Sequence, residues 1–218
     1  MKYEIAGNPD QGDLTVGLEA GETILTESGA MSRMSAHMEV NARLIGGFVK
    51  AVARKLLGGE SLFLSEYQAA EAGFVSISPK LPGSIAVREL RGETFYLTSG
   101  SFLACTPGVE LSTRFGGLRA FFSGEGGFLI ECTGTGTLFF NSYGAIVEKD
   151  VNGALTVDTG HVVAFEPTLD YQIRGMGGLK QTVFSGEGLV MAFEGSGKIY
   201  VQTRVVQGLV KWLRPFCR

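Results

Sequence analysis

FSGEG occupies residues 122–126 of this chain, and the same five residues return at 184–188. A glycine-rich pentapeptide with a hydroxyl and a carboxylate is compatible with a phosphate cradle, with half of a catalytic pair, or with a turn in a repeated fold. A phosphate loop needs Gly-Lys-Ser/Thr before a helix, whereas a strand-like apolar run follows each copy here. The pentapeptide therefore indicates a turn and directs attention to internal repeats.

The same series of landmarks recurs along the chain. Each copy has a Ser/Thr-Gly pair, then an arginine followed by two glycines, then Gly-Glu with an apolar run, and then a last strand-like run. The Ser/Thr-Gly pairs are Ser28-Gly29, Ser99-Gly100 and Thr159-Gly160. We place the copies at about 14–84, 85–144 and 145–205, followed by a tail at 206–218, within a single domain over residues 1–218. Three tandem copies in a chain of this size predict one shared core around a pseudo-threefold axis.

Charged residues recur at corresponding places in the copies. They are Arg43, Arg114 and Arg174, with Glu60, Glu125 and Glu187. A catalytic pair is normally needed once, so repetition favours a structural role, with Arg–Glu ion pairs within or between copies. The alternative is a symmetric site for a ligand or anion, built three times.

The apolar residues alternate with polar ones in short runs. Leu14, Val16 and Leu18 are one example, and glycine, asparagine or aspartate turns separate the runs. A period of two bounded by turn residues is typical of β-strands. The spacing predicts an all-β fold, either a sandwich or a closed, barrel-like sheet, because open edges on every copy would promote aggregation.

Composition excludes several classes of protein. The chain is 44% hydrophobic and 19% charged, which is typical of a globular protein. Its net charge of −3 argues against nucleic acid as a partner. The three cysteines form no CxxC pair, and His37 and His161 lie in different copies, so we expect no metal, no cofactor and no disulfide framework. No secretory signal or membrane-spanning run is recognisable, so we expect a cytoplasmic protein.

Two stretches depart from the strand pattern and predict short amphipathic helices with a basic polar face. One is an insert at 48–57 in the first copy, and the other is the tail. Two alternatives are open for these helices. They either pack on the β-core or on another subunit, or they contact a membrane surface or a partner. The residues that we select for membrane or partner contact are Phe48, Lys50, Arg54, Lys55 and Trp212.

The wording of several motifs resembles the altered-inheritance-of-mitochondria twenty-four family. They are ESGAM at 27–31, GGESLFL at 58–64, DTGHVVAF at 158–165 and FSGEGLVMAFEGSGKIYVQTR at 184–204. The resemblance implies an all-β fold similar to the tryptophan RNA-binding attenuator type, with barrel units of the double-stranded β-helix kind around a pseudo-threefold axis. It also implies homo-oligomerisation. Fungal relatives are linked to mitochondrial membrane organisation, but the targeting extension expected of them is not recognisable here, and no catalytic residues carry over.

Together these observations predict a non-enzymatic, self-associating β scaffold that acts as a protein-interaction or membrane-peripheral module. The alternative is a binding protein for a small apolar or anionic ligand. RNA binding would call for basic stripes with stacking aromatic residues, and an enzyme would need a cluster of shifted titratable groups in one cleft. The arginines are too sparse for such stripes, and a cluster of shifted groups becomes visible only in a structure.

Overall fold

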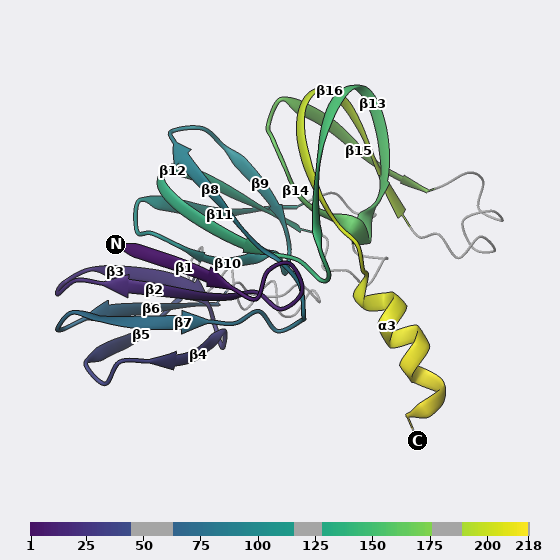
Figure 1. Cartoon of the computed structure of the whole chain (residues 1–218). Coiled ribbons are helices and arrows are strands. Elements are labelled where there is room, and N and C mark those ends of the chain that lie inside the picture. Colours follow the sequence, from purple (N-terminus) through teal and green to yellow (C-terminus); the bar gives the residue numbers. More distant parts are fainter. Residues whose placement is uncertain (45–62, 116–127, 176–188, 218) are drawn as a thin grey trace.

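The computed structural model describes residues 1–44, 63–115, 128–175 and 189–217. Antiparallel β-strands make up most of this part of the chain, and one short α-helix follows at its C-terminal end (Figure 1). The predicted all-β class and the C-terminal helix are confirmed. Both FSGEG copies and the insert at 48–57 lie outside the described residues, so the turn and the helix expected there stay predictions.

The first part of the chain contributes strands to both sheets of the molecule. A four-stranded sheet has the order β1–β2–β7–β4, and β3, β6 and β5 continue one end of a 12-stranded sheet. The bounds are Lys2–Ala6 for β1, Asp13–Leu18 for β2, Thr23–Glu27 for β3, Met31–Met34 for β4, Met38–Leu44 for β5, Phe63–Ala69 for β6 and Gly73–Ile77 for β7.

A long strand, β12, organises the second part. Its N-terminal half pairs with β9 and β11, and its C-terminal half pairs with β8 and β10. The bounds are Ile85–Arg91 for β8, Phe95–Thr98 for β9, Phe102–Cys105 for β10, Val109–Phe115 for β11 and Phe128–Asn141 for β12.

Two long strands organise the third part. β13 and β16 pair along their whole lengths, β14 joins the C-terminal half of β16, and β15 joins its N-terminal half. The bounds are Ile146–Asp158 for β13, Val162–Phe165 for β14, Leu169–Gly175 for β15, Leu189–Gln202 for β16 and Val206–Leu213 for helix α3. Short 3₁₀ turns follow β13 and α3, at Thr159–His161 and Arg214–Phe216.

The strands form where the alternation of apolar residues predicts them. Leu14, Val16 and Leu18 of β2 are buried, and the residues between them are half-buried, because successive side chains of a strand point to opposite faces. The long strands bend at glycines with positive φ, namely Gly134 in β12 (φ +91°) and Gly195 in β16 (φ +124°). Only glycine adopts such angles without strain, so β12 and β16 change their neighbours at these points.

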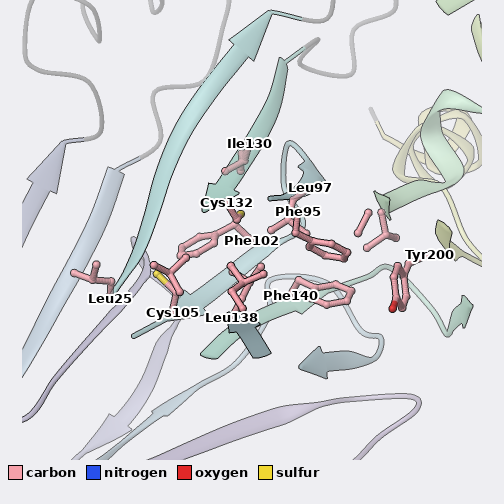
Figure 2. Packing of buried hydrophobic residues seen from close by; sticks show 14 of the residues in the cluster. Leu25, Phe95, Leu97, Phe102, Cys105, Ile130, Cys132, Leu138, Phe140 and Tyr200 are labelled. Atoms are coloured by element: carbon pink, nitrogen blue, oxygen red, sulfur yellow. The ribbon is translucent and has the colours of Figure 1, made fainter. Parts of the chain in front are cut away.

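A central hydrophobic cluster draws residues from all three parts of the chain. Leu25 comes from the first part, Phe95 and Phe140 from the second, and Tyr200 from the third (Figure 2). The rings of Phe95, Phe140 and Tyr200 form a triangle with centroid distances of 5.7, 5.7 and 5.5 Å. Tilted and edge-on contacts at this spacing add to the free energy of burial. This cluster therefore joins the three parts of the chain, and two further clusters lie in the first part with adjoining residues of the second and in the third part with Leu129 of the second.

The three parts also join through hydrogen-bonded strands. β10 pairs with β3 of the first part, with Ala104 opposite Thr26 and Cys105 opposite Leu25. β14 pairs with β9 of the second part, with Ala164 opposite Leu97 and Phe165 opposite Tyr96. These two junctions connect the 12-stranded sheet from one end to the other.

The expectation of a closed, barrel-like sheet is wrong for the described part of the chain. A barrel closes when its last strand pairs with its first. Among the described strands, β1 pairs with β2 alone, β4 with β7 alone, β5 with β6 alone and β13 with β16 alone, so each sheet ends in two open edges. Figure 1 shows β4 and β13 at opposite ends of the fan of strands.

Candidate functional site

The repeated charged positions are only partly described. Arg43 on β5 is exposed, and its Nη1 lies 2.9 Å from Oε2 of Glu66 on the neighbouring strand β6. Arg174 on β15 is also exposed, and the side chain of Arg114 lies outside the described residues. Glu60, Glu125 and Glu187 lie outside them too, so the predicted Arg–Glu pairs stay a prediction. An exposed pair such as Arg43–Glu66 contributes about 0–1 kcal/mol, which is consistent with a minor structural role.

The structure describes only one of the five residues that we selected for membrane or partner contact. Phe48, Lys50, Arg54 and Lys55 lie outside the described residues. Trp212 lies on α3, where its side chain is 65% exposed.

Helix α3 projects away from the sheets (Figure 1). It has no buried residue, although its sequence is amphipathic as predicted. Its exposed apolar side chains, including Phe216 of the following 3₁₀ turn, are Val206, Val210, Trp212, Leu213 and Phe216. Exposed apolar residues in such density are uncommon on a protein surface.

Two aromatic side chains lie together at the end of this segment. The ring centroids of Trp212 and Phe216 are 5.5 Å apart, and Phe216 is 71% exposed. Lys211 and Arg214 are exposed beside them, and residues 203–218 contain no aspartate or glutamate. The segment therefore combines aromatic and aliphatic surface with uncompensated positive charge.

A charged network at the junction of the second and third parts was not predicted. Arg88 on β8 lies at its centre, with Nη1 3.2 Å from Oε1 of Glu166 and Nη2 3.7 Å from Oε1 of Glu93. Its guanidinium carbon lies 5.2 Å from the centroid of the Phe95 ring, in the geometry of a cation–π contact. Glu166 follows β14, and its other oxygen, Oε2, accepts a hydrogen bond of 2.9 Å from the backbone N–H of Lys198.

The network continues to Glu148 on β13, whose carboxylate is hydrogen-bonded to Nζ of Lys198. This hydrogen bond lowers the pKa of Glu148 and raises that of Lys198. Burial raises the pKa of Tyr200, and the charge of Glu148 raises it further. Each described carboxylate of this network has a cation beside it. The network links β8, β13 and β16 with the residue that follows β14.

Two buried cysteines and His161 are the other groups of interest in the described part of the chain. Burial raises the pKa of the Cys105 thiol to about 12 and that of the Cys132 thiol higher still, so neither forms a thiolate at neutral pH. His161 Nδ1 is hydrogen-bonded to the backbone carbonyl of Gln202 at 2.6 Å. Within the described ranges, no three histidine, cysteine or acidic side chains gather as metal ligands would.

Sequence reasoning had little chance of finding Arg88. Its ion-pair partner Glu166 is 78 positions away, and neither residue belongs to the repeated landmarks. The tail, in contrast, carried a clear signal in its helical periodicity.

The described part of the chain is therefore an antiparallel β protein with an exposed C-terminal helix. A family model described as mitochondrial biogenesis AIM24 matches residues 3–204. An uncharacterized protein of Streptococcus pyogenes serotype M6 is 32% identical over 197 residues, covering 86% of this chain and 79% of that protein. The crystal structure of a Streptococcus pyogenes protein has a TM-score of 0.85 and 29% identity, and the match covers 99% of both chains.

The chain therefore belongs to the AIM24 family, as the resemblance of its motifs indicated. Among the residues that the structure describes, no helix is long and apolar enough to cross a membrane.

Proposed function

We propose that this protein is a non-catalytic, cytoplasmic β scaffold that self-associates and binds to anionic membrane surfaces through its C-terminal helix. Its body consists of three tandem repeats of the double-stranded β-helix kind around a pseudo-threefold axis. The observation that carries the membrane contact is the exposed apolar surface of α3 and the turn after it, including Trp212 and Phe216.

The order of strand pairing supports the repeats. In the first part, β7 lies between β2 and β4, and β6 lies between β3 and β5. In the second part, the two halves of β12 lie between β8 and β10 and between β9 and β11. In the third, the two halves of β16 lie between β13 and β14 and between β13 and β15. A register shift also follows the first residue of β4, β10 and β14 alike.

The state of the titratable groups supports a role without catalysis. Arg88 and Lys198 neutralise the carboxylates around them, and the buried thiols have raised pKa values. Groups that act as acids or bases at neutral pH usually have pKa values moved towards 7 instead. The exposed Cys217 and the unpaired buried thiols fit a reducing compartment such as the cytoplasm.

The chemistry of α3 matches that of a membrane surface. Trp and Phe side chains prefer the headgroup boundary, and nearby basic residues are attracted to anionic lipids. A helix of eight residues has little apolar surface, so one copy binds weakly. Self-association presents several such helices to one surface and raises the avidity without any new contact.

The test is co-flotation of the full chain with vesicles of phosphatidylcholine and phosphatidylserine at low and high salt. We expect flotation at low salt that decreases as salt screens the basic residues. Trp212→Glu places a charge on the apolar side and should reduce flotation by a large factor.

Gln207→Glu is the matched control, because it adds the same charge to the polar side of α3. We expect it to retain most of the binding. Equal losses in both variants would show that net charge alone drives binding. No flotation of the wild-type chain at low salt would overturn the membrane contact.

A further inference from the structure

Among the described strands, the two sheets end at β1 and β4 and at β13 and β5, and two of these edges, β4 and β13, correspond to strands that pair elsewhere within the chain. β4 pairs with β7 on one side, and residues 154–158 of β13 pair with β16 on one side. In the described part of the chain, neither has a strand on its other side. An edge of this kind presents backbone N–H and C=O groups with which a further strand can pair.

Within the chain, strands of successive parts pair in the same way at two places. β10 pairs with β3, and β14 pairs with β9, in the same antiparallel sense and over two residue pairs each. In both cases the four-residue strand of one part joins the strand before the Ser/Thr-Gly pair of the preceding part. β4 is the four-residue strand of the first part, and residues 154–158 precede Thr159-Gly160 in the third.

The register of a third such junction follows from the other two. Counted from the glycine of each Ser/Thr-Gly pair, Arg33 corresponds to Ala104 and Ala164, and Val157 corresponds to Thr26 and Leu97. The neighbouring positions correspond in the same way: Met34 to Cys105 and Phe165, and Thr156 to Leu25 and Tyr96.

Exposure sets β4 apart from its two counterparts. Every residue of β10 and β14 is buried, whereas every residue of β4 is exposed. Met31 and Met34 are each 36% exposed. Thr156 is exposed as well, and Val157 is half-buried. Both edges thus leave open the surface that the internal junctions cover.

We propose that β4 of one copy pairs antiparallel with residues 154–158 of a second copy, with Arg33 opposite Val157 and Met34 opposite Thr156. This inference rests on the proposed self-association and specifies the edges that carry it. The occupant is a second copy, because the two edges are the separate halves of one junction type and lie at opposite ends of the molecule (Figure 1).

The contact is head-to-tail, so a pair of copies retains one free β4 edge and one free β13 edge. Such contacts produce a ring when the rotation closes, and an open filament when it does not. At the position of Ser32 in β4, the counterpart strands have Leu103 and Val163. At the position of Arg33, they have Ala104 and Ala164. These polar residues tolerate water before assembly, so the junction forms between copies that are already folded.

The test is disulfide trapping in a Cys217→Ser background. A Met34→Cys chain and a Thr156→Cys chain, with different tags, are co-expressed, purified and oxidised. Opposite residues of an antiparallel pair have Cβ atoms about 4.5–5.5 Å apart, so small local movements allow a disulfide. Arg33→Cys with Val157→Cys provides the adjacent pair, since opposite positions alternate in spacing. Light scattering gives the mass of the parent chain.

We expect an oligomer whose two chains cross-link only when both substitutions are present on different chains. Met34→Cys with Asp150→Cys is the offset control and should give no cross-link, because Asp150 lies in the other half of β13, opposite Lys198. Each co-expressed pair is compared with its two single variants on non-reducing gels.

Several outcomes would overturn the inference. An oligomer without the mixed cross-link, or one in which Met34→Cys alone cross-links, would place self-association on another surface. A cross-link within a single chain that carries both substitutions would mean that the edges close on each other. A monomeric mass at every concentration would overturn this junction and the proposed self-association together.

Discussion

Arg88 and Glu166 are 78 positions apart in the chain, yet Nη1 of Arg88 lies 3.2 Å from Oε1 of Glu166. The pair connects β8 of the second part to the residue that follows β14 of the third. Both side chains are largely buried, with exposed fractions of 27% and 20%. Solvent and salt therefore screen this pair less than a surface pair. The pair reinforces the junction of β14 with β9, in which the strands share two residue pairs.

Arg88→Met should destabilise the protein, because it removes the cation from Glu166 and the contact with the Phe95 ring. We expect a loss of about 1–2 kcal/mol in the free energy of unfolding, measured with urea. Lys80→Met is the matched control, since the Lys80 side chain is 63% exposed in its pair with Glu27. It should cost less than about 1 kcal/mol. Equal losses would assign no special role to the Arg88 junction.

The pair formed by Glu148 and Lys198 predicts a dependence of stability on pH. The Lys198 hydrogen bond holds the pKa of Glu148 below its ordinary value of 4.5 in the folded state. The stabilisation is therefore present above pH 4.5 and is lost as pH falls through the folded pKa. The raised pKa of Lys198 means that the same pair weakens again only at strongly alkaline pH.

Lys198→Met should lower the free energy of unfolding at pH 7, and the difference from wild type should shrink as the pH falls below 4.5 and through the folded pKa of Glu148, where protonation removes the carboxylate charge. Urea titrations of both proteins between pH 3 and 7 measure this difference. A difference that stays constant over the whole range would mean that the Lys198 substitution acts through packing instead.

Gly134→Ala should destabilise the bend in β12 for two reasons. Its φ of +91° is strained for alanine, and an added Cβ would lie 2.3 Å from the backbone oxygen of Gly108. Gly153 separates the two effects, because its φ is +109° but nothing lies within 4 Å of an added Cβ. We expect Gly153→Ala to cost about 1–3 kcal/mol, and Gly134→Ala to cost at least about 1 kcal/mol more. Thermal and urea unfolding of both variants measure this, and equal costs would contradict the overlap with Gly108.

Thiol titration should find one reactive cysteine in the native protein. Cys217 is exposed, whereas Cys105 and Cys132 are buried with raised pKa values. All three should react once urea unfolds the chain. Cys217→Ser should leave no fast-reacting thiol in native buffer. Fast reaction of a second thiol at pH 7 would show that the core opens readily at β10 or β12.

Much of the fold was predictable because its signals are local. The alternation in residues 14–18 predicts a strand whose inward side chains are buried, and the periodicity of the tail predicts the helix that carries Trp212. The Arg88 network was not predictable, because no repeat or spacing relates β8 to Glu166. The sequence also did not predict whether Trp212 is buried or exposed, since an amphipathic helix can pack on its own core or project away from it.

The sequence by itself determined the all-β class, the amphipathic tail and membership in a family whose motifs it shares. Only the tertiary structure decided which strands pair across the parts of the chain, where the charged network lies, and that the sheets end in open edges, β4 and β13 among them, without closing. The physical reason is the range of the interactions. Side-chain alternation and turn residues act over a few neighbours, whereas strand pairing and ion pairs such as Arg88–Glu166 join residues that the folded core brings together.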